Sequence, residues 1–285
     1  MSILQIHAQP SRTTVWILSW FLFAAGVVSY FWVSRGRHID NPDDRVMPTL
    51  RQMGQAFADA TLKPAEDDEV TGNPDKESLA TKIHNSMLWK DTVATGRRFL
   101  ISMALLFPAV LLGLHMGMFP YVGSFFLRFV LFFDKIVALS LLPILFIAFG
   151  IDELAKVMLI VVGVAPTIIL DSFNLTRGVP KEQIVKGFTL GAGDFSITYR
   201  IVFKQIWPRV LNSIRLNLKA VMLFLFAGEM IASQDGLAYR IALLRRHMGM
   251  DTIIPYVLWV ALLLFLVDFG MRTLNRKLHP WFQEA

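Results

Sequence analysis

Apolar residues in this chain gather in long runs, and several of these runs are long enough to cross a lipid bilayer. A membrane-spanning helix needs about 20 consecutive, mostly apolar residues. The pattern predicts six spans, at residues 13–33, 99–119, 121–150, 157–170 with its flanks, 210–233 and 252–271. Charges at 128, 134 and 135 interrupt the third run, which is either one kinked span or an interfacial helix followed by a span from Ile136. The predicted fold class is an all-α, polytopic membrane protein.

Composition supports the membrane class and excludes several kinds of chemistry. The chain is 54% hydrophobic and 18% charged, whereas about a quarter of a soluble domain is charged. The basic residues behind the net charge of +6 are spread along the connections, which disfavours nucleic-acid binding. There is no cysteine, which excludes disulfides and thiolate catalysis. The run at 13–33 is longer than the apolar core of a signal peptide, so we expect an uncleaved first span.

The connections divide the chain into three parts. Residues 1–33 form the first span, 34–98 an extracytoplasmic loop with an amphipathic segment at 47–62, and 99–285 the membrane core. Within the core, the connection at 181–208 and the C-terminal tail are rich in lysine and arginine. Because basic connections stay on the cytoplasmic side, we expect both termini and this connection to be cytoplasmic. Arg240, Arg245 and Arg246 oppose that orientation.

The connection at 181–208 is too polar to cross lipid and too apolar to be a free linker. Ile184, Phe188, Gly191 and Phe195 recur at helical spacing on one face, and the glycines at 191 and 193 interrupt that face. The pattern predicts a short helix, a glycine turn and a second short helix, with Phe188 as an aromatic knob rimmed by charge. Such an element either docks a soluble partner or lies on the lipid surface.

Several short motifs resemble the permease subunits of ATP-binding-cassette importers, in the nitrate, sulfonate, taurine and bicarbonate branch. The loop motif is Thr189-Leu190-Gly191-Ala192-Gly193, followed at the family's spacing by Pro208 and Arg215. Further matches are Leu142-Pro143 before Gly150, Ala227-Gly228-Glu229-Met230-Ile231-Ala232, and Leu278-His279-Pro280-Trp281. The similarity runs from about residue 48 to the end of the chain.

The resemblance implies a function, a set of partners and a location. In such proteins the loop forms coupling helices that sit in a cleft of a separate ATPase subunit, and a solute-binding protein delivers a small polar solute from outside. It further implies a homodimer among lipids of the bacterial inner membrane, working by alternating access. The loop residues that would shape the ATPase interface are Glu182, Lys186, Phe188, Gly191, Ala192 and Asp194.

The chain departs from the family pattern at three places. Val185-Lys186-Gly187 stand where the family often has a polar residue and two alanines, and Phe203-Lys204 replace a Leu-Pro pair. Val137-Ala138 replace paired prolines ahead of Pro143. We therefore expect a diverged or partner-specific permease.

Other candidate chemistry is sparse. The chain has no G-x-x-x-x-G-K-[ST] motif, so we expect it not to hydrolyse ATP, and its histidines lack metal-ligand spacing. Neither a catalytic residue nor a cofactor is predicted. Glu229, Ser140 and Pro143 are candidates for the translocation path, although Glu229 is alternatively a structural residue paired with a lysine or arginine. An ion-gradient-driven transporter and a non-transporting scaffold for a soluble partner are the alternative functions.

Overall fold

The computed structural model describes residues 11–40, 46–62, 86–246 and 249–282, and the regular structure in these ranges is helical throughout, which confirms the all-α class. The acidic part of the expected extracytoplasmic loop, at 64–77, lies outside the described residues. The chain divides into an N-terminal unit (1–59 with 244–255) and a core unit (60–243 with 256–285).

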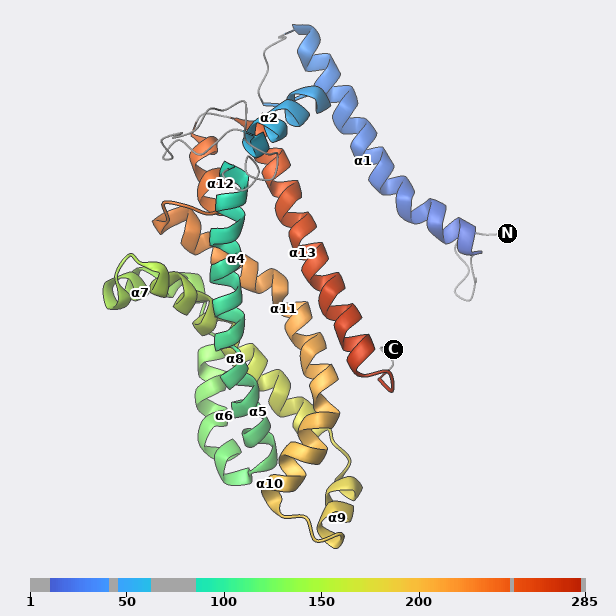
Figure 1. Cartoon of the computed structure of the whole chain (residues 1–285), viewed down its shortest axis with the longest axis vertical. Helices are drawn as coiled ribbons and strands as arrows, with labels where there is room; N and C mark the ends of the chain where they lie inside the picture. The colour runs from blue at the N-terminus through green and yellow to red at the C-terminus, as the bar shows by residue number, and fades with distance from the viewer. Residues whose placement is uncertain (1–10, 41–45, 63–85, 247–248, 283–285) are drawn as a thin grey trace, which may run out of the picture. The chain divides into compact units, whose positions relative to one another are not determined.

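The helices are long, and several follow one another with little connection between them (Figure 1). Their bounds are α1 Arg12–Asp40, α2 Leu50–Leu62, α4 Met87–Leu105, α5 Phe107–Met118, α6 Pro120–Asp134, α7 Leu142–Phe149, α8 Glu153–Arg177, α9 Lys181–Thr189, α10 Asp194–Ser196, α11 Phe203–Ala232, α12 Leu237–Arg245 and α13 Met250–Leu278. A 3-10 helix, Ala138–Leu141, precedes α7, and a π-helix, Ile197–Val202, precedes α11.

The N-terminal unit confirms the amphipathic helix predicted at 47–62. The helix α2 begins with a reciprocal cap, because the Thr49 amide donates to Gln52 Oε1 (2.8 Å) and the Gln52 amide donates to the Thr49 hydroxyl (3.4 Å). The Tyr30 hydroxyl on α1 donates to the Pro48 carbonyl (3.0 Å). Most side chains of α1 have no protein cover within the described chain, as expected for a helix that faces lipid.

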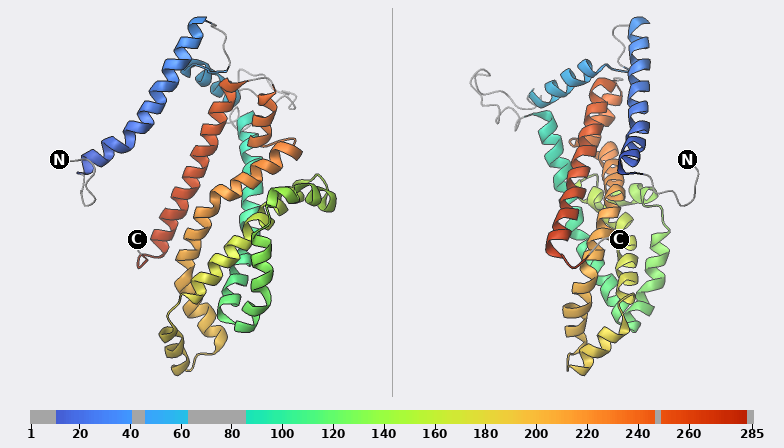
Figure 2. Two further views of the ribbon diagram at one scale, coloured as in Figure 1. Left: turned by 180° about the vertical axis from the view of Figure 1, so that it is seen from behind. Right: turned by 90° about the vertical axis from the view of Figure 1, so that its right-hand side faces the viewer.

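The core unit is built around α8, which packs against both α5 and α11. Leu114, Ile160, Ile168 and Leu225 are almost fully buried along these contacts. The helix α9 lies at one end of the unit, and α12 with the start of α4 lies at the other end (Figure 2). Two regions of interest, the loop after α8 and the far end of α11, are therefore held apart by the length of α11.

Five of the six predicted spans have a matching helix, and the third is irregular. Among the described residues, five helices are long and apolar enough to cross a membrane: Thr13–Ile39, Met87–Met118, Glu153–Arg177, Asp194–Ala232 and Met250–Leu278. The helix α6 and the Ala138–Phe149 helix reach spanning length only as a pair, bent by 86° at a short break, which is the geometry of a broken span or of a re-entrant loop. The bend is present although Val137-Ala138 stand where the family has prolines.

Two spans begin earlier than the hydropathy pattern predicts. The second begins at Met87 instead of residue 99, and the fifth helical segment begins at Asp194 instead of residue 210. Arg98 made residues 87–98 resemble a polar connection, but the charge of Arg98 is buried and paired with Glu229. In the segment that begins at Asp194, Ile197 and Val202 are fully buried against the core, so protein rather than lipid covers its apolar face.

Close helix contact at Gly113 accounts for the small-xxx-small pattern at 113 and 117. A Cβ atom on Gly113 would lie 2.4 Å from the Ile169 carbonyl oxygen, and one on Gly117 would lie 2.5 Å from Thr176 Cβ. Both neighbours belong to α8 of the same chain. The pattern therefore serves packing within the chain, which brings the backbones of α5 and α8 together.

We expect Gly113→Ala to lower the free energy of unfolding by about 1–3 kcal/mol, because a tight contact must open to admit the methyl group. Thermal unfolding in detergent measures the change. The matched control is Gly96→Ala on α4, where an added Cβ meets nothing within 4 Å. That variant should be neutral or more stable, since alanine favours helix over glycine by about 1 kcal/mol. Equal midpoints for the two variants would contradict the packing argument.

Candidate functional site

The helix α9 and the turn after it form the first candidate site, which we call the α9 loop (residues 181–193). The helix ends in a Schellman motif, because the Gly191 amide donates to the Phe188 carbonyl (2.9 Å) and the Ala192 amide to the Gly187 carbonyl (3.1 Å). Gly191 has φ +79°, and an added Cβ would meet nothing within 4 Å. Backbone conformation, and not crowding, therefore requires glycine here.

The second short helix expected after the turn is instead the first part of a long one. From Asp194 the chain passes through α10 and the π-helix directly into α11, and it stays helical to Ala232. Pro208 lies inside α11, where its carbonyl accepts a hydrogen bond from Asn275 Nδ2 on α13 (3.0 Å). The expectation failed because the pattern of charges suggested a surface loop up to Pro208. The turn at Gly191 is therefore followed within three residues by a long helix.

Aromatic side chains at four-residue intervals mark this connection. Phe195 and Tyr199 stack with centroids 6.1 Å apart, and Phe203 and Trp207 lie 5.1 Å apart. The Tyr199 hydroxyl lies 3.0 Å from Nε2 of His115 on α5. These contacts join the start of the long helix to α5.

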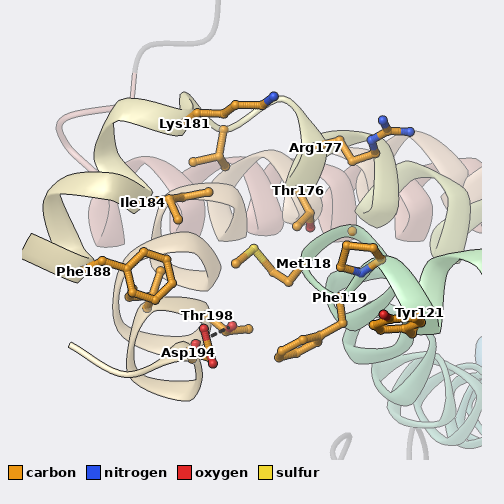
Figure 3. Close-up of a pocket in the computed structure, with 14 residues that line it drawn as sticks. Met118, Phe119, Tyr121, Thr176, Arg177, Lys181, Ile184, Phe188, Asp194 and Thr198 are labelled. Atoms are coloured by element: carbon orange, nitrogen blue, oxygen red, sulfur yellow. Dashed lines mark hydrogen bonds between the residues drawn. The ribbon is translucent and has the colours of Figure 1, made fainter. Parts of the chain in front are cut away.

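A pocket of about 520 Å³ lies between α9 and the ends of α5 and α8 (Figure 3). Phe188 and Ile184 line it from α9, whereas Arg177 and Lys181 bring positive charge to its edge and Asp194 brings a carboxylate. The lining residues are Gly117, Met118, Phe119, Pro120, Tyr121, Thr176, Arg177, Val179, Lys181, Ile184, Phe188, Asp194, Ile197 and Thr198.

The predicted loop residues occupy different faces of this region. Phe188 and Asp194 line the pocket, Glu182 and Lys186 are exposed, and Ala192 is partly buried against the core. Large apolar side chains also reach the surface at the turn: Phe188 is 49% exposed, Leu190 is 79% exposed and Phe195 is 69% exposed. Apolar groups rimmed by charge are typical of a protein-binding surface. Leu190 was not among the predicted residues, although its place in the turn motif marked it.

The second candidate site is a buried ionic cluster around Arg98, on α4 near the far end of α11. Arg98 Nη1 donates to Glu229 Oε1 (2.9 Å), and Nη2 donates to Glu153 Oε1 (2.8 Å) and to the Asp235 carboxylate. Lys156 Nζ donates to Glu153 Oε1 (2.8 Å). The Arg98 cluster is thus made of Thr95, Arg98, Glu153, Lys156, Glu229 and Asp235.

Glu229 shows the paired arrangement that was one of its two expected roles. It is 0% exposed and accepts hydrogen bonds from Thr95 Oγ1 (2.9 Å), Arg98 and the Ala238 amide (3.1 Å). Ser140 and Pro143 lie elsewhere, on the 3-10 helix and α7, where both are exposed in the single chain. Their place in a translocation path, with Glu229, stays a prediction.

A second buried pair lies beside the cluster. Arg240 Nε donates to Asp91 Oδ2 (2.9 Å), and the Gly236 amide donates to Asp91 Oδ1 (3.1 Å). Burial, the largest single effect, lowers the pKa of Arg240, but the hydrogen bond and the charge of Asp91, together with Tyr256 and Tyr239, hold the pKa above its ordinary value. The charge of Arg240 is therefore paired with a buried carboxylate.

Sequence reasoning missed Arg98 because hydropathy placed it in a connection just outside the second span. The available signal was a pair of facts taken together: an arginine at the edge of one apolar run and a glutamate inside another. Buried charges in membrane segments occur in pairs. Among the described residues, no group of three or more histidine or acidic side chains is arranged to hold a metal ion.

We expect Arg98→Met to destabilise the protein by about 3–5 kcal/mol, because it leaves Glu229 buried without a compensating charge. The yield of folded protein and its thermal unfolding in detergent measure this effect. The control is Lys135→Met, which breaks the exposed Lys135–Asp134 pair (3.0 Å) and should cost less than about 1 kcal/mol. If both variants unfold at the wild-type temperature, the cluster does not stabilise the fold.

Comparison with known proteins places the chain among transport proteins. It is 26% identical over 205 residues to the taurine transport system permease protein TauC of Escherichia coli (strain K12), covering 70% of this chain and 74% of that one. It is 27% identical over 143 residues to the putative aliphatic sulfonates transport permease protein SsuC of Bacillus subtilis (strain 168), covering 50% and 52%.

One solved structure and one family model complete the comparison. The structure is an inward-facing form of the MetNI methionine ABC transporter, with a TM-score of 0.48 and 17% identity over 62% of this chain and 92% of that one. The family model, described as binding-protein-dependent transport system inner membrane component, matches residues 109–280, more than half of the chain. Both the Gly191 turn and Glu229 fall within that match, and the chain belongs to the inner membrane components of binding-protein-dependent transport systems.

Proposed function

We propose that this permease subunit of an ATP-binding-cassette importer carries a small sulfonate across the inner membrane, driven by a separate ATPase subunit that docks on the α9 loop. The main support for this proposal is the continuous helix from Asp194, just after the Gly191 turn, to Ala232. A push on the turn therefore acts on a helix that reaches through the core unit. The exposed apolar groups of the loop support a protein partner over a free surface.

We further propose an orientation and an assembly for the chain. The α9 loop and both termini face the cytoplasm, in keeping with the basic residues of that loop and of the C-terminal tail. A second copy of the chain completes the pathway, with lipid around both. Exposed apolar side chains on α6 and α13, such as Phe129 and Phe265, offer surface for the second copy or for lipid.

The sulfonate assignment rests on the named relatives, because TauC and SsuC are described as permeases for taurine and aliphatic sulfonates. The alternative, a transporter driven by an ion gradient, predicts membrane-buried titratable pairs and inverted repeats. The described residues hold such a pair, Arg98–Glu229, and the family match favours the ATP-driven function over this alternative.

We expect Leu190→Asp to weaken binding of the ATPase subunit by about tenfold or more, because a central apolar contact becomes a charge. The side chain is 79% exposed, so the fold should be unaffected. Co-purification from detergent measures binding, and Leu190→Met is the matched control because it keeps the apolar surface. An aspartate variant that retains the ATPase at the wild-type ratio would show that the partner docks elsewhere.

Uptake in proteoliposomes tests the solute. With the ATPase subunit and the binding protein present, labelled taurine should accumulate only when ATP is inside. An excess of another aliphatic sulfonate should reduce the uptake, whereas nitrate and bicarbonate should not. If nitrate or bicarbonate competes and sulfonates do not, the chain serves a different solute, although the coupling part of the proposal stands.

A further inference from the structure

We infer that Arg98 is a positioning residue for transport: it keeps α4, the start of α8, the end of α11 and the segment at 233–238 together as one block throughout the cycle. The inference rests on the proposed ATP-driven transport. It identifies a part of the core unit whose helices do not move relative to one another during the cycle. We call this region the Arg98 block. The motion of alternating access is then taken up by parts of the chain outside it.

The side chain of Arg98 joins several segments of the core unit. Arg98 projects from α4 and contacts Glu153 at the start of α8, Glu229 near the end of α11, and both the carboxylate and the carbonyl of Asp235. The planar guanidinium offers its donors in a fixed fork. Moving any one of these segments away from α4 would break a hydrogen bond to Arg98, and of the three carboxylates only Glu153 would keep a second cation, Lys156.

Opening the Arg98 block would cost free energy. Glu229 is 0% exposed, so separation from Arg98 would leave a carboxylate buried without its counter-charge. Such a loss is much larger than the gain from the pair itself, because the desolvation cost remains. Glu153 and Asp235 differ in this respect, since their side chains are more than half exposed. Water can compensate them, and it cannot compensate Glu229.

Backbone amides also hold the Arg98 block together. The Leu237 amide donates to Thr95 Oγ1 (2.9 Å), and the Ala238 amide donates to Glu229 Oε2 (3.1 Å). Gly236 has φ +114°, and a Cβ there would lie 2.7 Å from the Glu229 carboxyl carbon. The segment after α11 is therefore folded over the Arg98–Glu229 pair and is bonded to α4, which closes the block on a third side.

The chain offers a direct way to test the block, because it has no cysteine. A Cβ atom on Gly228 would lie 3.4 Å from Lys156 Cβ, close to the separation of about 3.5–4.5 Å found in disulfides. Lys156→Cys with Gly228→Cys therefore places a reversible bond between α8 and α11 inside the block. No other native thiol competes for it.

The test uses the full transporter with its ATPase subunit and binding protein in proteoliposomes. If the block stays together, the double variant transports taurine equally well after oxidation and after reduction. Its disulfide also forms to the same extent with and without ATP. When Arg98→Gln is added to this pair, transport should be lost and the disulfide yield should differ with and without ATP, because the block is no longer held together.

Loss of transport on oxidation, with recovery on reduction, would overturn the inference, because α8 and α11 would then have to separate at this end. A disulfide yield that falls with ATP would overturn it independently, even if the reduced double variant is inactive. Gly228→Cys alone controls for the added side chain. If wild-type vesicles transport no sulfonate, the proposed solute fails, and the disulfide yield with and without ATP still decides the question of the block.

Discussion

The fold of the core unit depends on how one arginine is kept charged away from water. Arg98 is almost fully buried and meets three carboxylates, of which Glu229 is fully buried and two lie at the surface. A single carboxylate would neutralise the charge but would leave guanidinium donors without acceptors. The arrangement that satisfies them requires α4, α8 and α11 to converge on one point. The positions of these helices, and of the segment that leads into α12, follow from that requirement.

The opposite end of the unit is organised by backbone conformation and aromatic contact. The Gly191 turn ends α9 without a partner from elsewhere in the fold, since its hydrogen bonds are local. The π-helix and the aromatic side chains from Phe195 to Trp207 then join the turn to α5 and α11. With 30 residues, α11 is about 45 Å long at the usual rise per residue. The helix α11 therefore runs from the region of the α9 loop to the Arg98 cluster.

Much of the fold could be predicted from the sequence, because membrane helices produce local patterns of apolar residues that are visible in the sequence. The five clear spans, the amphipathic helix in the segment 47–62 and the glycine turn each depend on neighbours in the chain. The Arg98 cluster could not be predicted, since its members are brought together only by tertiary structure: Arg98 lies 55 residues from Glu153 and 131 residues from Glu229. The continuous helix from Asp194 was missed for a related reason. Its charged residues look solvent-facing until the core that covers its other face is known.

The length of the path from the turn to Glu229 has a consequence for how related sequences can differ. Each residue added to an α-helix rotates everything beyond it by about 100°. An insertion between Phe203 and Glu229 would therefore turn the glutamate away from Arg98 and bury it among apolar side chains. The π-helix at Ile197–Val202 has a wider turn that absorbs an extra residue. Homologous chains should thus tolerate length changes in the π-helix and on the loop side of it, and should keep the spacing beyond Phe203 fixed.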